Sequence, residues 1–330
     1  MLSRRALLAA AIAAPTLQQA CAAPGGGEPE ASAWRTAPDA PYAVQEIYPA
    51  HYRGGVWIAG GFSPQAQGAT ERVIVLDLAS QQWREGPALP TPSHHVQLAA
   101  RNDELYAIGG FVGGDDRLRW NCTPRVLRLD GERWVDGPAL PKPIAEASPI
   151  VCEGRIHLIG GRSPSGAANA EWTDQTDVDD HFVLAPGAAA WERAAPLPLA
   201  RNSSGCAVNG SVIHVISGRT VASGQTPAHH IYDARAGAWR TGPAYPDPRG
   251  GLAAAFFRGR VVACGGEIFE PGSVGDALYE LTSDGWMRFQ TMPTPRHGHG
   301  LVEAGSALYA IGGARRPGGN GALSSVDVLD

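Results

Sequence analysis

The sequence has little that would build helices or a nucleic-acid surface. After residue 30 helix signals are weak, whereas Gly (42 residues) and Pro (27 residues) are abundant, as expected for short strands joined by turns. The net charge of −5 argues against a nucleic-acid groove, because such grooves need a basic face. After the first 23 residues no apolar segment is long enough to span a bilayer. The five Cys residues have no spacing that assigns a disulfide.

The first 23 residues indicate export. The segment Ser3-Arg4-Arg5-Ala6-Leu7-Leu8 resembles a twin-arginine motif, an apolar run follows, and Ala20-Cys21-Ala22 is a cleavage pattern. We therefore predict a signal peptide over 1–23, a flexible linker over 24–33 and one domain over 34–330, in a periplasmic or extracellular protein. The alternative is a lipid anchor at Cys21, although the residues before it fit a lipidation box poorly.

One spacing of 27 residues, from a Trp to the second Gly of a glycine pair, occurs six times. The distance from each of these Gly residues to the next Trp varies between 20 and 30 residues. A fixed half and a variable half at this period predict a closed array of repeats rather than separate domains. The six pairs are Trp34 and Gly61, Trp83 and Gly110, Trp134 and Gly161, Trp191 and Gly218, Trp239 and Gly266, and Trp286 and Gly313.

Each unit also predicts short strands. A Pro stands seven residues after every Trp, and each glycine pair follows an apolar run, with Ser217-Gly218 replacing the pair in the fourth unit. Alternating apolar positions between Gly, Pro, Asn and Asp clusters are typical of strands. Glycine at these positions allows positive φ or close backbone approach, and Trp supplies an apolar plate between neighbouring sheets.

These features resemble kelch repeats, and the resemblance covers residues 34 to 330. It implies an all-β fold, a six-bladed β-propeller with four-stranded blades. Trp34 has no glycine pair before it, and Gly313 has no Trp after it. We therefore expect the N-terminal strand that carries Trp34 to complete the last blade, which removes two open edges.

The variable loops and the turns before each first strand should open on one face, around the mouth of the central channel. Counting back from the second glycines places Arg201, Arg249 and Arg296 at this mouth. His94 and Glu146 are expected beside them, and Arg162 and Arg219 follow glycine pairs. Two interpretations are open: the Arg residues bind a carboxylate ligand, or they pair with Glu46, Glu146 and Glu267 as struts between blades.

The two longest variable loops each carry a Trp outside the repeat register, Trp120 and Trp172. Either ring can be a stacking platform for a sugar, or it packs its own loop. The second loop also contains several Asp residues, but they lack the regular spacing of a calcium loop. His297 and His299 share one strand face as half of a metal site, with no third ligand evident. We therefore predict no metal and no cofactor.

Three functions are compatible with this pattern. The first is a binding module for a glycan, a sugar acid or a protein partner. The second is suggested by similarity to the sialic-acid mutarotase (N-acetylneuraminate epimerase) family, which implies an acid–base role for Glu267, with His297 as another candidate. The Arg that this family carries within the same loop is missing here. The third is a copper oxidase like galactose oxidase, for which the metal-ligand pattern is weak.

Overall fold

The computed structural model describes residues 33–113 and 115–330. The predicted signal peptide, the lipid anchor and all of the linker except Ala33 lie outside these residues. Residues Ala33–Asp330 form one compact unit. Within the described part of the chain, no helix is long and apolar enough to cross a membrane, and Cys122, Cys152, Cys206 and Cys264 are free thiols.

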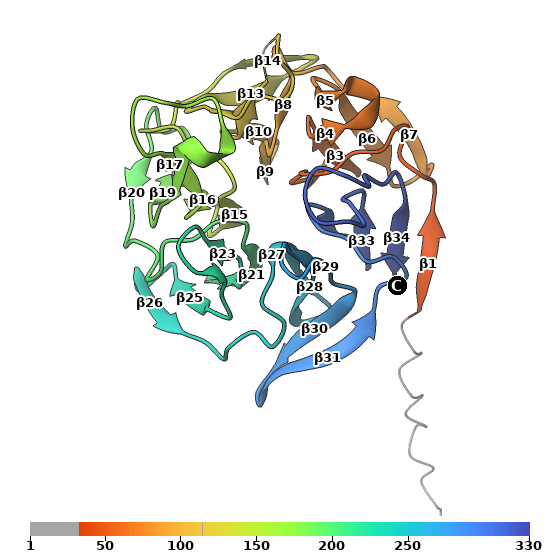
Figure 1. Ribbon diagram of the computed structural model, residues 1–330, viewed down its shortest axis with the longest axis vertical. Coiled ribbons are helices and arrows are strands. Elements are labelled where there is room, and N and C mark those ends of the chain that lie inside the picture. Colours follow the sequence, from red (N-terminus) through yellow and green to blue (C-terminus); the bar gives the residue numbers. More distant parts are fainter. Residues whose placement is uncertain (1–32, 114) are drawn as a thin grey trace, which may run out of the picture. The chain divides into compact units, whose positions relative to one another are not determined.

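The described residues form six blades, each an antiparallel sheet with four main strands, arranged in a ring (Figure 1). The first three are β2 (Ala50–Tyr52), β3 (Gly55–Ala59), β6 (Val73–Asp77), β7 (Gln82–Glu85); β9 (Gln97–Arg101), β10 (Glu104–Ile108), β13 (Val126–Asp130), β14 (Arg133–Asp136); and β15 (Ser148–Cys152), β16 (Arg155–Ile159), β19 (His181–Leu184), β20 (Glu192–Arg193). The others are β21 (Gly205–Asn209), β22 (Val212–Ile216), β25 (His229–Asp233), β26 (Ala238–Thr241); β27 (Gly250–Phe257), β28 (Arg260–Ile268), β30 (Ala277–Thr282), β31 (Gly285–Thr291); and β32 (Gly300–Ala304), β33 (Ala307–Ile311), β34 (Val326–Leu329), β1 (Trp34–Ala37).

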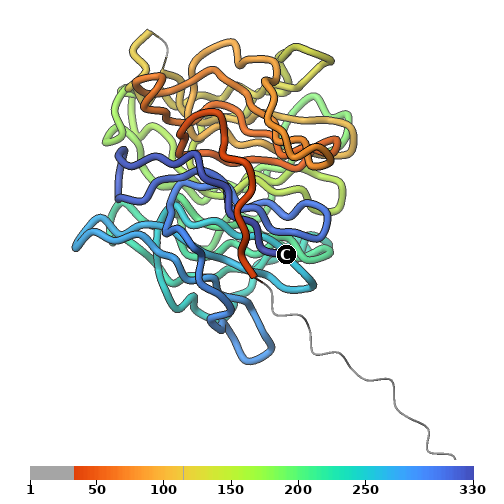
Figure 2. The backbone as a smooth tube through the Cα atoms, turned by 90° about the vertical axis from the view of Figure 1, so that its right-hand side faces the viewer, coloured from red at the N-terminus to blue at the C-terminus, as the bar shows by residue number. Residues whose placement is uncertain are grey.

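The ring closes as predicted. The first strand β1 pairs antiparallel with the last strand β34, with Trp34 opposite Leu329 and Ala37 opposite Val326. Arg35 also forms an ion pair with Asp330 beyond this ladder. The tube view in Figure 2 follows the red N-terminal segment alongside the C-terminal end. The two ends of the domain therefore complete one blade together.

The repeated Trp residues join each blade to the one before it. From the second repeat on, the indole N–H donates to the carbonyl oxygen four residues after the preceding Trp, over 2.7 to 3.2 Å. The glycine pairs have positive φ, and a Cβ on Gly161 would lie 2.4 Å from the carbonyl oxygen of Ala145. The constant spacing is thus a requirement of the scaffold, since both ends of it contact a neighbouring strand or blade.

The variable loops after the glycine pairs form small ribbons in five blades. They are β4 (Phe62–Ser63) with β5 (Gly68–Ala69), β11 (Phe111–Val112) with β8 (Ser93–His94) and β12 (Asn121–Cys122), β17 (Arg162–Pro164) with β18 (Gln175–Asp177), β23 (Arg219–Thr220) with β24 (Gly224–Gln225), and β29 (Ser273–Val274) with β28. Two 3₁₀ turns, η1 (Pro64–Ala66) and η2 (Trp172–Asp174), lie in these loops. The residues that begin the ribbons surround the end of the central channel described next.

Candidate functional site at the channel mouth

Six residues, one from each blade, form a backbone ring at the channel mouth, which we call the mouth ring. Each lies fifteen residues before a second glycine and has φ between +51° and +66°. In five of them the backbone N–H donates to the carbonyl of the ring member before it, over 2.7 to 3.1 Å. Two of these residues, Glu46 and His95, line the pocket described next. The members are Glu46, His95, Glu146, Ser203, Gly251 and Gly298.

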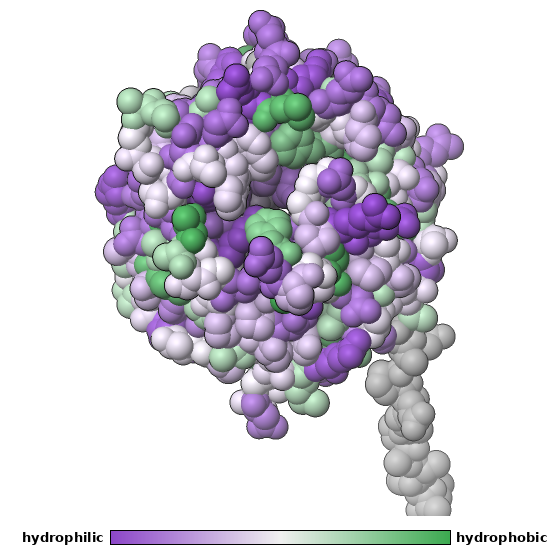
Figure 3. Space-filling view, in the orientation of Figure 1, coloured by the Kyte–Doolittle hydropathy of each residue, from purple (hydrophilic) through white to green (hydrophobic). Residues whose placement is uncertain are grey.

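A pocket of about 240 Å³ lies over this ring. Its walls are aromatic, and Figure 3 shows a central hollow on this face with hydrophobic residues at its edge. The wall residues are Phe62, Trp120, Trp172 and Phe269. A second cavity of about 470 Å³ adjoins it and shares Gln45, Phe62, Trp120 and Gly319. The site therefore consists of two adjoining cavities rather than a flat surface.

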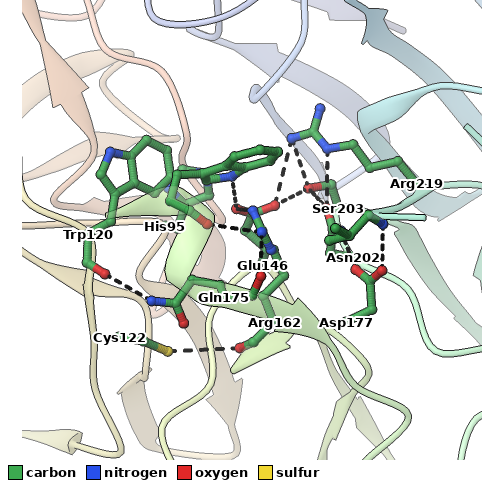
Figure 4. Close-up of polar contacts among 12 residues, drawn as sticks. His95, Trp120, Cys122, Glu146, Arg162, Gln175, Asp177, Asn202, Ser203 and Arg219 are labelled. Atoms are coloured by element: carbon green, nitrogen blue, oxygen red, sulfur yellow. Dashed lines mark hydrogen bonds and ion pairs between the residues drawn. The ribbon is translucent and has the colours of Figure 1, made fainter. Parts of the chain in front are cut away.

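Arg219 lines the inner pocket, and Figure 4 shows its guanidinium directed toward Glu146 and Ser203. Its Nη1 is 2.8 Å from Glu267 Oε1, and its Nη2 is 3.7 Å from Glu146 Oε2. The ring of Phe269 lies 4.7 Å from the guanidinium carbon. Burial lowers the pKa of Arg219, but Glu146, Glu267 and Glu46 outweigh burial and raise it. The guanidinium of Arg219 thus forms ion pairs with the carboxylates of Glu146 and Glu267.

Glu146 is buried below the pocket and fully bonded (Figure 4). It accepts from Ser203 Oγ at 2.6 Å and from Trp172 Nε1 at 3.2 Å. Arg162 Nη1 lies 3.8 Å away, and its guanidinium stacks 4.0 Å from the Trp172 ring. Burial raises the pKa of Glu146, whereas His95, Arg219 and Arg162 lower it and prevail. Trp172 is therefore held in place by Glu146 and Arg162. Together with Glu46, Glu267 and Arg219, these two residues form the charged lower side of the pocket, which we call the floor.

Glu46 lies between two histidines on the opposite side of the floor. Its Oε2 is 3.0 Å from His95 Nε2, and its Oε1 is 3.6 Å from His297 Nδ1. Burial raises the pKa of Glu46, but His95, His297 and Arg219 together lower it to about 2. A Cβ on Gly298 would lie 2.7 Å from the Glu46 carboxylate. Glycine at this ring position therefore leaves the space that Glu46 occupies.

Most of the residues selected from the sequence meet at this site. Trp120, Trp172, Arg219 and Glu267 line the pocket. Others lie directly behind the lining, in contact with it: Glu146, Arg162, His94 and His297. Arg219 and Arg162 are placed as the strut interpretation expects, because each lies against a carboxylate.

The three Arg residues expected at the mouth do not line the pocket. The guanidinium of Arg201 donates to the carbonyls of Leu199, Val215 and Ser217. Arg296 donates to the carbonyls of Gly312 and Ser325 and pairs with Asp327. Arg249 pairs with Asp247 at 2.8 Å and donates to Ser273 Oγ at 3.1 Å. All three are therefore scaffold residues, placed two positions before the mouth ring.

Several lining residues were not selected from the sequence. His95, Phe62 and Phe269 face the pocket, and Glu46 was expected only as a strut. The sequence signal that identifies the mouth ring is an offset of fifteen residues before each second glycine, whereas the offset of seventeen leads to Arg201, Arg249 and Arg296, which bond to the scaffold. His299 does not join His297, because its Nε2 contacts Cys264 Sγ at 3.7 Å. Among residues 33–113 and 115–330, no group of three His, Cys, Asp or Glu is arranged to hold a metal ion.

Comparisons with known proteins agree with the fold. No protein-family model matches the chain. It is 23% identical over 310 residues to Kelch-like protein terF of Aspergillus terreus, covering 88% of this chain and 67% of that protein. It is 26% identical to alpha-scruin of Limulus polyphemus (77% of this chain) and 25% identical to kelch domain-containing protein SSO1033 of Saccharolobus solfataricus (83%).

The chain spans only 28% and 36% of the latter two relatives. The solved structure of YjhT superposes with a TM-score of 0.75 at 17% identity, covering 89% of this chain and 96% of that one. At this identity the likeness concerns the fold. The relatives therefore identify the architecture, and the ligand must be argued from the pocket.

Proposed function

The chain is a kelch-repeat β-propeller, and from this premise we propose that it is a binding module whose channel-mouth pocket takes an uncharged carbohydrate. The supporting observation is an aromatic wall above a polar floor in which Arg162 and Arg219 each lie beside a carboxylate. Trp120 and Phe62 line both cavities, so a sugar ring can stack at the point where they join. The adjoining cavity gives room for a further sugar unit.

The floor disfavours a sugar acid. Its three carboxylates are Glu46, Glu146 and Glu267, and both nearby guanidinium groups, Arg162 and Arg219, lie against carboxylates. A carboxylate ligand would have to break one of these pairs and leave a buried charge without its partner, which is costly. A sugar hydroxyl can instead donate to the floor without disturbing them.

Trp120→Ala is expected to weaken binding of an uncharged sugar at least about tenfold, whereas Trp120→Phe keeps an aromatic face and stays within about threefold. The measurement is calorimetric titration with galactose, N-acetylglucosamine and their β-linked disaccharides, with N-acetylneuraminate as the anionic probe. Thermal melts of both variants verify that they remain folded. Binding of N-acetylneuraminate alone would contradict the charge argument. No binding by any probe would contradict carbohydrate recognition.

A second candidate function is interconversion of sugar anomers in the same pocket. Glu267 Oε2 is 3.4 Å from His297 Nδ1, and His297 Nε2 is 2.8 Å from the carbonyl oxygen of Arg316. The carbonyl can only accept, so His297 Nε2 carries hydrogen and Nδ1 faces the carboxylates of Glu267 and Glu46. Glu267 lines the pocket and can take up and return the proton of an anomeric hydroxyl, while His297 lies behind it and can stabilise the charge on its carboxylate.

Glu267→Gln is expected to abolish any acceleration of anomer exchange while changing sugar affinity by less than about tenfold, because Gln keeps the shape of the side chain but not its basicity. Proton NMR of freshly dissolved α-galactose, with and without protein, measures the exchange rate. An equal rate with wild-type protein and with buffer would remove this candidate and leave binding alone.

We also propose that the protein is exported, on the basis of the twin-arginine and cleavage patterns in residues 1–23. Fractionation of cells expressing the full chain tests this, since retention of the protein in the cytoplasm would contradict it.

A further inference from the structure

Two adjacent histidines at the mouth have hydrogen-bond partners that fix how many protons they hold. His94 Nε2 lies 3.1 Å from the carbonyl oxygen of Arg119, and His94 Nδ1 lies 2.7 Å from His95 Nδ1. His95 Nε2 lies 3.0 Å from Glu46 Oε2. This series of contacts therefore runs from the carbonyl oxygen of Arg119 through both imidazole rings to the carboxylate of Glu46.

The carbonyl oxygen at one end of this series of contacts can only accept a hydrogen bond, and the Glu46 carboxyl group at the other end accepts in its ionised form, which the nearby His95, His297 and Arg219 favour by lowering its pKa. The carbonyl oxygen of Arg119 requires hydrogen on His94 Nε2, and the ionised carboxylate of Glu46 requires hydrogen on His95 Nε2. If neither ring carried another hydrogen, two bare Nδ1 atoms would face each other at 2.7 Å, which is repulsive. One hydrogen must lie between them. Three hydrogens on four ring nitrogens give the pair one positive charge.

The same count gives the opposite result for the other histidine pairs. His157 Nδ1 lies 2.8 Å from His181 Nε2, and His181 Nδ1 lies 3.1 Å from the carbonyl oxygen of Ala195. A hydrogen on the Nδ1 atom of each ring is enough to form both of these hydrogen bonds, so both rings are neutral. His214 and His229 repeat the arrangement in the next blade. The mouth pair alone among these three pairs ends on acceptors at both sides.

The two rings have different surroundings. Burial, followed by the nearby charge of His95, lowers the pKa of His94 well below its usual range. The His94 ring is stacked 3.9 Å from Phe62 and 5.1 Å from Phe111, which cannot solvate a cation as water does. His95 instead faces the carboxylate of Glu46 directly, feels the charge of Glu146, and lies beside the Tyr48 ring.

We propose that His94 and His95 share a single proton, act as one cation, and so hold Glu46 as the ionised acceptor that meets the ligand. Among the three floor carboxylates Glu46 has the most exposed side chain, 15% against 3% for Glu267 and 0% for Glu146. A ligand must then present a hydroxyl or ammonium donor to Glu46, while a carboxylate group is repelled. This ligand preference rests on the proposed function; the shared proton does not.

Nitrogen-detected NMR of the free protein tests the shared proton without any ligand. In ¹⁵N-histidine-labelled wild-type protein at pH 7, we expect three protonated nitrogens in the His94 and His95 rings. His157, His181, His214 and His229 serve as internal controls, each with hydrogen on Nδ1 alone. Two neutral rings at 94 and 95, whichever nitrogen of His95 carries the hydrogen, would overturn the proposal.

Two substitutions of His94 separate proton sharing from packing. The amide of His94→Gln can accept from His95 Nδ1 and donate to the Arg119 carbonyl, whereas His94→Phe keeps only the stacking on Phe62. The readout is the carboxyl ¹³C titration of Glu46, whose wild-type midpoint is expected near 2. We expect a low midpoint in the wild type and in His94→Gln, and a higher one in His94→Phe. An unchanged midpoint in His94→Phe would overturn the positioning role.

The ligand preference has a separate readout in the sugar titrations. Glu46→Gln is expected to weaken galactose binding about tenfold and to improve relative binding of N-acetylneuraminate. If no sugar binds but the NMR result holds, the proposed function fails while the shared proton stands.

Discussion

Deleting residues 1–37 is expected to lower the free energy of unfolding by on the order of 5 kcal/mol relative to a chain that begins at residue 33. The longer deletion removes the four residue pairs between β1 and β34 and the packing of Trp34 against the last two blades. It also exposes the edge of β34, which can then pair with another chain. Thermal and denaturant unfolding of the two truncated proteins measures the difference.

The chain that begins at residue 33 is the matched control, because it lacks the same N-terminal segment but keeps β1. We expect it to melt close to the full-length protein, and the longer deletion to melt about 10 °C lower or to aggregate. Equal melting temperatures for the two truncated proteins would show that β1 does not close the ring energetically.

Acidification from pH 6.5 to pH 4 is expected to destabilise the protein by several kcal/mol, on the order of 1.4 kcal/mol per unit of each pKa shift. Burial lowers the pKa of His157 and His214 to about 4, and that of His181 and His229 to about 3, from about 6.5. The unfolded chain therefore binds more protons throughout this window. Stability is highest above pH 6.5 and falls as the pH falls toward the folded-state pKa values. Denaturant unfolding measured across this range gives the slope.

A control variant can replace the four histidines with the residues that stand at the same positions in another blade. Blade two has Tyr106 where His157 and His214 stand, and Val126 where His181 and His229 stand. Replacing both pairs in this way is expected to reduce the slope between pH 6.5 and pH 4, because these four buried bases are then absent while His94, His230 and His299, whose pKa values burial also lowers, remain. A slope equal to that of the wild type would assign the acid sensitivity to other groups.

The architecture could be predicted from the sequence because it depends on backbone geometry repeated at fixed intervals. The Trp side chains and glycine pairs contact neighbouring backbone, so their spacing cannot change without breaking the ring. The unpaired Trp34 predicted the closing strand for the same reason. The loop residues Trp120 and Trp172 were identified because they fall outside that repeat.

The charged part of the site could not be predicted so well, because register gives a backbone position but not the direction of a long side chain. Arg201 and Arg296 turn back to strand-end carbonyls, although their positions lie near the mouth. The side-chain directions of His94 and His95 could not be predicted from register either. Strict strand alternation does not describe them, because the φ of His95 is +54° and turns its ring into the pocket lining.

In the mouth ring, the main chain holds neighbouring blades together, and the side chains of Glu46 and His95 line the pocket. Five of the ring's blade-to-blade bonds are made by main-chain N–H and carbonyl groups, so they do not depend on which side chains its members carry. Four side chains and two glycines stand on identical backbone. A new specificity can therefore arise by substitution at the four positions that carry side chains and in the loops above them, while the main-chain bonds continue to hold the blades together. Such a molecule can diversify its ligand without first acquiring a new fold.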